Sequence, residues 1–265
     1  MKIEYIIGIL IIWGLISCSD RDENQEPTYG KVNVALSVTL PEPENVHSLA
    51  RSYTDSEIKN VDVLVFDEDG KFMERVKVDG GELTPSGTEI SFSIRLDATS
   101  KRRVIHLVTN GRSPDGVTDR LNFNDITSGM LESAAIPALG TTAMIFGSLE
   151  DQVMPLIMWG RVELPTGINI VTKADGVKLL RVAACVQVKK GVGDATNGLN
   201  DFIIQSVTVD KGFDRGYLTP ANYSTVVTPV TGRPLSGSTL NYANGWCDGE
   251  TPSLYIYERN CTVAD

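Results

Sequence analysis

Arg51 is the residue of this chain whose surroundings most directly suggest chemistry. It lies between Ala50 and Ser52 in the polar stretch PEPENVHSLARSYTDSE (residues 41–57), which is rich in proline, glutamate, serine and aspartate. Such a stretch cannot continue a β-ladder, so we expect an exposed loop. Exposed loops are where proteases find their cleavage sites. The sequence therefore predicts cleavage between Arg51 and Ser52 by a trypsin-like or arginine-specific protease.

The segment before this loop, Lys31–Leu40, is predicted to be one long strand. Its sequence KVNVALSVTL alternates apolar and polar side chains with the period of two that is typical of a half-buried strand. The apolar face consists of Val32, Val34, Leu36, Val38 and Leu40. Burying these five side chains contributes roughly 8–15 kcal/mol before the entropy cost, which is comparable to the net stability of a domain.

Cleavage after Arg51 would leave this strand attached to its domain only by non-covalent contacts. If the strand were then lost, an apolar groove lined by unpaired backbone groups would open. Such a groove demands a replacement strand.

The other reactive residues do not form a recognisable catalytic or metal site. The sequence has no HExxH motif, GxSxG elbow or Walker loop, and its four cysteines include no CxxC pair. With only two histidines, His47 and His106, the sequence has few candidate residues for a catalytic triad or a zinc site. We therefore expect no enzyme activity, no metal and no cofactor. Cys247 and Cys261 could form a disulfide in an oxidising compartment, with free thiols as the alternative.

The overall composition limits the class of protein and its partners. The chain has 265 residues, a formal charge of −10 and a pI near 4.8, with no basic stripe, which argues against a nucleic-acid partner. A hydrophobic content of 42% is that of an ordinary globular protein. This length accommodates one large all-β domain or two smaller ones, and we expect two.

The N-terminus has the pattern of an exported protein. Residues 1–17 carry a basic residue followed by the apolar run Tyr5–Ile16, which is too short to span a bilayer and is typical of a signal peptide. The run ends in Leu15-Ile16-Ser17-Cys18, which resembles the lipobox of bacterial lipoproteins. This resemblance implies that Cys18 is acylated and becomes the mature N-terminus, and multiple acyl chains would form a firm anchor. The alternative is an ordinary signal peptide with an incidental cysteine.

Residues 18–30 are predicted to be an acidic tether. The sequence SDRDENQEPTYG is polar and has no periodicity, as expected for a disordered linker. Acidic residues directly after such a cysteine also resemble the surface-export signal of lipoproteins in the Bacteroides group. A solvated linker without an export role is the alternative.

The rest of the chain is predicted to be mostly β-structure. Val61–Val78 is expected to form a hairpin with an Asp-Gly turn, and turn chemistry explains Asp67, Asp69 and Gly70 better than a calcium loop does. Asn122–Ala135, with Asn124 or Asp125 as the N-cap, is the only convincing helix. Further strands are expected at residues 90–96, 103–109, 143–146, 154–159, 161–164, 202–209 and 254–258, and at 177–190, where a helix over 178–185 is the alternative.

A stretch of Thr, Gly, Asn and Asp at residues 166–176 is predicted to be a hinge, with a two-residue turn at Asp175-Gly176. We place the domain boundary there. The expected division is an N-terminal β-sandwich domain at residues 31–166 and a C-terminal one at 167–265.

The order of these features resembles the FimA-type fimbrillins, which are subunits and accessory lipoproteins of the type V pili of the Bacteroides group. The lipobox at Cys18, the first strand and Arg51 in a loop occur in the family's order. The later motifs that carry the resemblance are VDVLVFDEDGKF (61–72), PLIMWGRVELP (155–165), LLRVAACVQVKK (179–190), FIIQSVTVDKGFDRGYLTP (202–220) and LYIYERN (254–260). Cys185 stands where the family commonly has a basic or polar residue.

The resemblance implies an all-β fold of two transthyretin-like β-sandwich domains with one short helix. It also implies that Cys18 is acylated, that Arg51 is the cleaved arginine and that Lys31–Leu40 is the displaced strand, whose groove is filled by a strand from the next subunit. The implied partners are other fimbrial subunits, lipoprotein-processing enzymes, an arginine-specific protease and the outer membrane. The implied location is the cell surface, in a fimbrium that supports adhesion. Family members usually continue well past the Y-x-Y-E-R element, so we expect a truncated second domain.

A monomeric surface lipoprotein that binds glycan or peptide is the alternative function. Trp159 and Trp246 are its candidate stacking platforms. Trp159 lies in a dense apolar run, which favours a position in the core.

Overall fold

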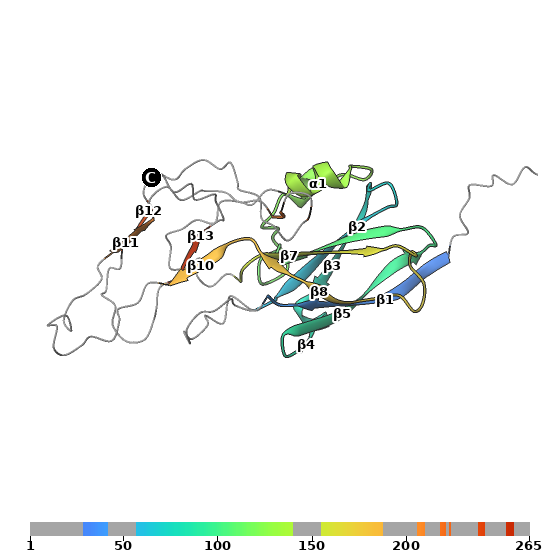
Figure 1. Ribbon diagram of the computed structural model, residues 1–265, viewed down its shortest axis with the longest axis horizontal. Helices are drawn as coiled ribbons and strands as arrows, with labels where there is room; N and C mark the ends of the chain where they lie inside the picture. The colour runs from blue at the N-terminus through green and yellow to red at the C-terminus, as the bar shows by residue number, and fades with distance from the viewer. Residues whose placement is uncertain are drawn as a thin grey trace, which may run out of the picture.

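The structure is a computed structural model of the chain, and it describes residues 29–41, 57–139, 155–187, 206–209, 218–220, 223, 238–241 and 253–256. Over these ranges the chain is mostly β-strand with one short α-helix, which confirms the all-β prediction (Figure 1). None of the described helices has the length and apolar character needed to cross a membrane. The predicted strand at residues 143–146 lies outside the described residues.

Two β-sheets form an N-terminal sandwich. The first has the strand order β4-β5-β1-β8 and the second the order β3-β2-β6-β7-β9. Their strands are β1 (Tyr29–Thr39), β2 (Asn60–Phe66), β3 (Phe72–Asp79), β4 (Thr84–Ser86), β5 (Glu89–Ala98), β6 (Arg103–Thr109), β7 (Met158–Leu164), β8 (Lys173–Lys178) and β9 (Leu180–Arg181). Neighbouring strands are antiparallel except β1 and β8, which are parallel.

The main hydrophobic core lies between the two sheets. Strand β5 alternates buried and exposed residues, so it has one face in the core and one toward solvent. Strands β2 and β6 are buried along their whole length, because the outer face of their sheet is also covered. The core includes Val34, Leu36, Val38, Val63, Ile90, Phe92, Ile94, Leu96, Ile105, Leu107 and Met158.

A second apolar cluster covers the outer face of the second sheet. The helix α1 (Glu132–Ala138) and the 3-10 turn η3 (Phe123–Asp125) pack there through Ala135, Ile136 and Phe123. The predicted helix over Asn122–Ala135 is therefore wrong in its start, since residues 126–131 are not helical. Gly129 has a φ of 82°, a left-handed conformation that an α-helix cannot contain.

The predicted hairpin and its turn are confirmed at β2 and β3. The Asp67 carboxylate accepts hydrogen bonds from the backbone N–H groups of Asp69 at 2.9 Å and Lys71 at 2.8 Å, and Gly70 has a φ of 75°. Asp67 thus uses its oxygen to close the turn. Among the described residues, no cluster of His, Cys, Asp and Glu could hold a metal ion.

The predicted domain boundary at residue 166 falls inside the N-terminal sandwich. Strand β8 is part of the first sheet, and Ile168, Val177 and Leu179 belong to the main core. Gly167 has a φ of 79°, and a Cβ atom on it would lie 2.1 Å from the Thr99 carbonyl oxygen, so the turn after β7 requires glycine. The glycine and polar residues of this stretch therefore serve a turn within the domain.

The single strand predicted at residues 177–190 is divided among three sheets, since Val177 and Lys178 are the end of β8 in the first sheet. Strand β9 pairs with β7 in the N-terminal sandwich, whereas β10 (Ala184–Gln187) pairs with β13 (Ser253–Ile256). Strand β11 (Ser206–Val209) pairs with β12 (Ser238–Asn241) in a further two-stranded sheet. Within the described residues, the strands predicted at 202–209 and 254–258 overlap β11 and β13.

Candidate functional site

Strand β1 is an inner strand of the first sheet. It pairs antiparallel with β5, from Tyr29 opposite Ala98 to Thr39 opposite Glu89, and parallel with β8, from Ala35 beside Lys173 onward (Figure 1). Both of its backbone edges are therefore engaged. Without β1, unpaired edges of β5 and β8 would face each other across a gap one strand wide, about 10 Å from edge strand to edge strand.

The apolar face of β1 points into the main core. Val34 and Val38 have no exposed surface and Leu36 is 1% exposed, while Val32 and Leu40 are partly buried at the two ends. On β5 the paired residues Leu96, Ile94, Phe92 and Ile90 continue the same buried face. If β1 were absent, the space that it occupies would be an apolar groove with β5 and β8 as its rims and the second sheet as its floor.

One polar residue of β1, Ser37, is also buried, with only 3% of its surface exposed. Its hydroxyl accepts a hydrogen bond from the backbone N–H of Gly176 on β8 at 2.7 Å and donates one to the Glu89 carboxylate on β5. Sequence alternation alone assigned Ser37 to the solvent face. The predicted two-residue turn at Asp175-Gly176 is wrong, because both residues lie within β8.

The chain segments on either side of residues 42–56 are fixed to the sandwich. At the end of β1, the Leu40 N–H donates to the Thr88 carbonyl at 2.9 Å. Where the chain returns, the side chain of Asn110 binds the carbonyl of Glu57 at 2.9 Å and the N–H of Lys59 at 2.8 Å. Arg51, Ser52 and Cys18 lie outside the described residues.

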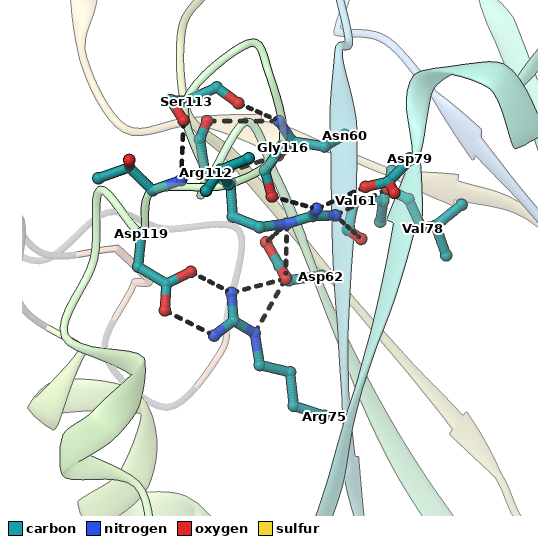
Figure 2. A network of polar contacts seen from close by, with 12 residues as sticks. Asn60, Val61, Asp62, Arg75, Val78, Asp79, Arg112, Ser113, Gly116 and Asp119 are labelled. Atoms are coloured by element: carbon teal, nitrogen blue, oxygen red, sulfur yellow. Dashed lines mark hydrogen bonds and ion pairs between the residues drawn. The ribbon is translucent and has the colours of Figure 1, made fainter.

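Beside this return point, a buried ion network joins β2, β3 and the segment after β6 (Figure 2). Arg112 is 1% exposed and Asp62 is fully buried. The guanidinium of Arg112 contacts the Asp62 carboxylate at 3.2 Å and donates to Asp79 at 2.6 Å. It also donates to the carbonyls of Gly116 at 2.9 Å and Val78 at 2.8 Å. Every edge of this guanidinium therefore has an acceptor.

A second arginine, Arg75, joins the network. Arg75 donates to Asp62 at 2.9 Å and forms a two-bond contact with Asp119 at 2.9 and 2.6 Å, while its guanidinium lies 3.5 Å from the centre of the Phe123 ring. Burial raises the pKa of Asp62, and the two guanidinium groups act in the opposite direction. Figure 2 shows Asp62 between the two arginines. The network holds the start of β2, and with it the chain after residue 56.

His106 lies in a separate polar cluster under α1. Its Nδ1 accepts the indole N–H of Trp159 at 2.9 Å, so its Nε2 carries the proton and donates to Glu132 at 2.7 Å. Arg161 also donates to Glu132 at 2.8 Å. Burial lowers the pKa of His106, and both of its ring nitrogens have hydrogen-bond partners. The cluster fixes the start of α1.

Trp159 does not provide the stacking platform that the alternative function needs. It is 3% exposed and packs in the second apolar cluster, with its N–H used by His106. Trp246 lies outside the described residues.

We expect this cluster to make the sandwich sensitive to acid. Burial opposes ionisation of Glu132, but hydrogen bonds from His106 and Arg161 outweigh it and lower the pKa of Glu132 to about 2 from its usual 4.5. A lowered carboxyl pKa stabilises the folded state above pH 4.5, and this contribution is lost as the pH falls toward 2. The lowered pKa of His106 adds a loss that begins near pH 6.5, because only the unfolded chain is protonated there.

Urea unfolding followed by circular dichroism from pH 7 to pH 3 tests this prediction. Glu132→Gln should be less stable at pH 7 and should lose less stability below pH 4.5 than the unsubstituted protein. Glu74→Gln, which removes only an exposed pair with Lys31, is the control and should follow the original curve. An unchanged acid profile in Glu132→Gln would contradict the assignment.

Comparison with solved structures shows that other proteins share this fold. A fimbrial assembly protein from Parabacteroides distasonis is 16% identical with a TM-score of 0.53, covering 87% of this chain and 77% of that protein. A candidate cell adhesion protein from the same organism is 14% identical with a TM-score of 0.53, covering 88% and 72%. These likenesses show a shared fold. No protein of curated function matches the sequence.

A family model gives the more specific result. The model described as fimbrillin-A associated anchor proteins Mfa1 and Mfa2 matches residues 23–179, which include part of the predicted acidic tether, β1, Arg51 and all strands of the N-terminal sandwich except β9. This match covers more than half of the chain. The protein therefore belongs to the family of fimbrillin-A associated anchor proteins Mfa1 and Mfa2.

Proposed function

We propose that the protein is a structural or accessory subunit of a cell-surface fimbrium, exported as a lipoprotein acylated at Cys18 and assembled by strand exchange. An arginine-specific protease cuts after Arg51, β1 leaves the sandwich, and a strand of another subunit fills the groove. The fimbrium supports adhesion at the outer membrane surface. The main support for this proposal is that β1 is an inner strand with a buried apolar face, while the chain from Glu57 onward is bound to the sandwich without help from β1.

The positions of the fixed points support a cut at Arg51. Leu40 and Glu57 are both tied to the sandwich, and Arg51 lies between them in the sequence. A cut there separates β1 from the rest of the domain while Asn110 and the Arg112 network still hold Glu57–Asn60 in place. The remaining sandwich would keep its second sheet and an open groove in its first. Since buried unpaired backbone is costly, the groove favours a new strand.

The mature N-terminus of the protein on cells tests this proposal. In assembled fibres we expect subunits that begin at Ser52, with precursors that begin at acylated Cys18, both measured by mass spectrometry of N-terminal peptides. Arg51→Ala should abolish the Ser52 species and keep the protein out of heat-resistant oligomers. Arg51→Lys separates the protease classes, because a trypsin-like enzyme still cuts it and an arginine-specific enzyme does not.

Two results would count against the proposal. If all surface copies begin at Cys18, the strand is not released and the protein acts as an uncut anchor. If Arg51→Ala forms the same oligomers as the unsubstituted protein, assembly does not depend on this cut.

A further inference from the structure

We propose that the groove of β1 accepts only strands that carry serine or threonine at one fixed position, between two buried apolar residues. This inference rests on the proposed strand exchange and specifies its partner. The incoming segment would match the Leu36-Ser37-Val38 pattern of β1 itself. The hydroxyl, rather than the apolar face, would set the register of the exchanged strand.

The argument begins with a bulge in β8. Leu36 lies beside Ala174 and Val38 beside Val177, so two steps along β1 correspond to three steps along β8. The extra residue lies at Asp175-Gly176, where Gly176 has a φ of 66°. A bulge of this kind turns a backbone N–H out of the regular ladder. Here that N–H belongs to Gly176, and a side chain, the Ser37 hydroxyl, is its acceptor at 2.7 Å.

The second requirement comes from the other rim of the groove. The Ser37 hydroxyl donates to the Glu89 carboxylate on β5, so the same oxygen accepts from one rim and donates to the other. Only 3% of Ser37 is exposed, which means that water has little access to replace either bond. A hydroxyl is the smallest side-chain group that both accepts and donates a hydrogen bond. Alanine would leave the Gly176 N–H unsatisfied, and aspartate would oppose the charge of Glu89.

The hydroxyl requirement distinguishes registers that the apolar face cannot. A strand displaced by two residues keeps its apolar side chains inward, because side chains alternate with a period of two. The same displacement moves the hydroxyl by about 7 Å, away from Gly176 and Glu89. The apolar face therefore excludes odd displacements. The bulge disfavours even displacements as well, except the one that brings Thr39, which lies between Val38 and Leu40, to the position of Ser37.

A peptide-exchange experiment tests this inference. The full chain is cut at Arg51, or at a specific protease site inserted into residues 42–56, and incubated with a labelled synthetic peptide of residues 30–41. Retention of the label on the protein is measured by anisotropy and native electrophoresis. The peptide variants are Ser37→Thr, Ser37→Ala, Ser37→Asp and Ala35→Ser/Ser37→Ala. Asn33→Ala is the matched control, because Asn33 is on the same strand and exposed.

The expected order of binding is specific. Ser37→Thr and Asn33→Ala should bind as the original peptide does, and Ser37→Ala should bind about tenfold more weakly. Moving the hydroxyl to position 35 should restore binding only in a register displaced by two residues, which leaves one end of the groove unfilled, so this peptide should still bind more weakly than the original. Ser37→Asp should bind weakest, and Glu89→Ala in the protein should improve binding of that peptide alone.

Two outcomes overturn the inference, and they are distinguishable. Equal binding of the original and Ser37→Ala peptides would refute the hydroxyl requirement and leave strand exchange intact. If the original peptide does not bind to protein whose cleavage has been verified, strand exchange itself is refuted, and the hydroxyl requirement with it.

Discussion

Leu36→Asp should prevent the N-terminal sandwich from folding. Leu36 is 1% exposed, lies at the centre of the inner strand β1 and contacts no polar partner in the main core. Removing its side chain in Leu36→Ala should already cost about 2–5 kcal/mol, which is the usual range for a buried leucine. A carboxylate in the same place adds the cost of an unpaired buried charge, so the total approaches or exceeds the net stability of a domain.

The matched control is Asn33→Asp, which introduces the same carboxylate on the same strand. Asn33 is exposed, so the substitution should change the unfolding free energy of the protein by no more than about 0.5 kcal/mol. Urea unfolding followed by far-ultraviolet circular dichroism, with limited proteolysis as a second measurement, checks both variants. A Leu36→Asp protein with a normal unfolding midpoint would show that β1 contributes little to the fold, which would also weaken the case for a groove that needs filling.

The inner strand β1 could be predicted because the alternation that indicates it lies within its own residues. The apolar residues of Lys31–Leu40 share one parity, and three of them, Val34, Leu36 and Val38, are fully buried as the pattern indicates. The hairpin at Asp67–Gly70 was predictable for a similar reason, since aspartate and glycine determine the turn through their own side-chain oxygen and backbone freedom.

The partner of β1 on its other side could not be predicted in this way. Strand β8 begins at Lys173, far from β1 in sequence, and periodicity does not specify which strands pair or whether they are parallel. Its glycine and polar residues indicated a hinge, although the burial of Ala174 and Val177 makes it part of the core. The interaction of Ser37 with Gly176 depends on that pairing, so it was equally hidden.

The ion network around Asp62 was missed for a different reason. Asp62 interrupts an apolar strand, and Arg112 lies in the sequence GRSPDG, which has the composition of a surface loop. Nothing local indicates that this loop folds back over the start of β2 and the end of β3 and buries its arginine. The isolated charge inside the buried strand VDVLVF was the available signal, because a buried carboxylate requires a partner.

Arg112→Ala should be among the most destabilising single substitutions in the sandwich, at about 3–5 kcal/mol, because it leaves a buried carboxylate with an incomplete set of partners. It would also remove the donor to the carbonyls of Val78 and Gly116 and the tie to Asp79. Arg75 still contacts Asp62, which should keep the loss within this range. Arg112→Lys should recover only part of the stability, since an ammonium group cannot reach acceptors on all edges of the guanidinium.

Arg102→Ala is the control for charge alone. Arg102 pairs with Glu163 at 2.9 Å, but both side chains are substantially exposed, at 37% and 42%, so the expected loss is at most about 1 kcal/mol. Urea unfolding of the three variants at pH 7 and at two salt concentrations separates the cases, because salt screens the exposed pair and hardly affects the buried one. The network also holds the start of β2. A protease site introduced just after residue 57 should therefore be cut more rapidly in Arg112→Ala than in the unsubstituted protein. Equal losses for Arg112→Ala and Arg102→Ala would mean that Asp62 finds another partner and that the network does not hold the start of β2.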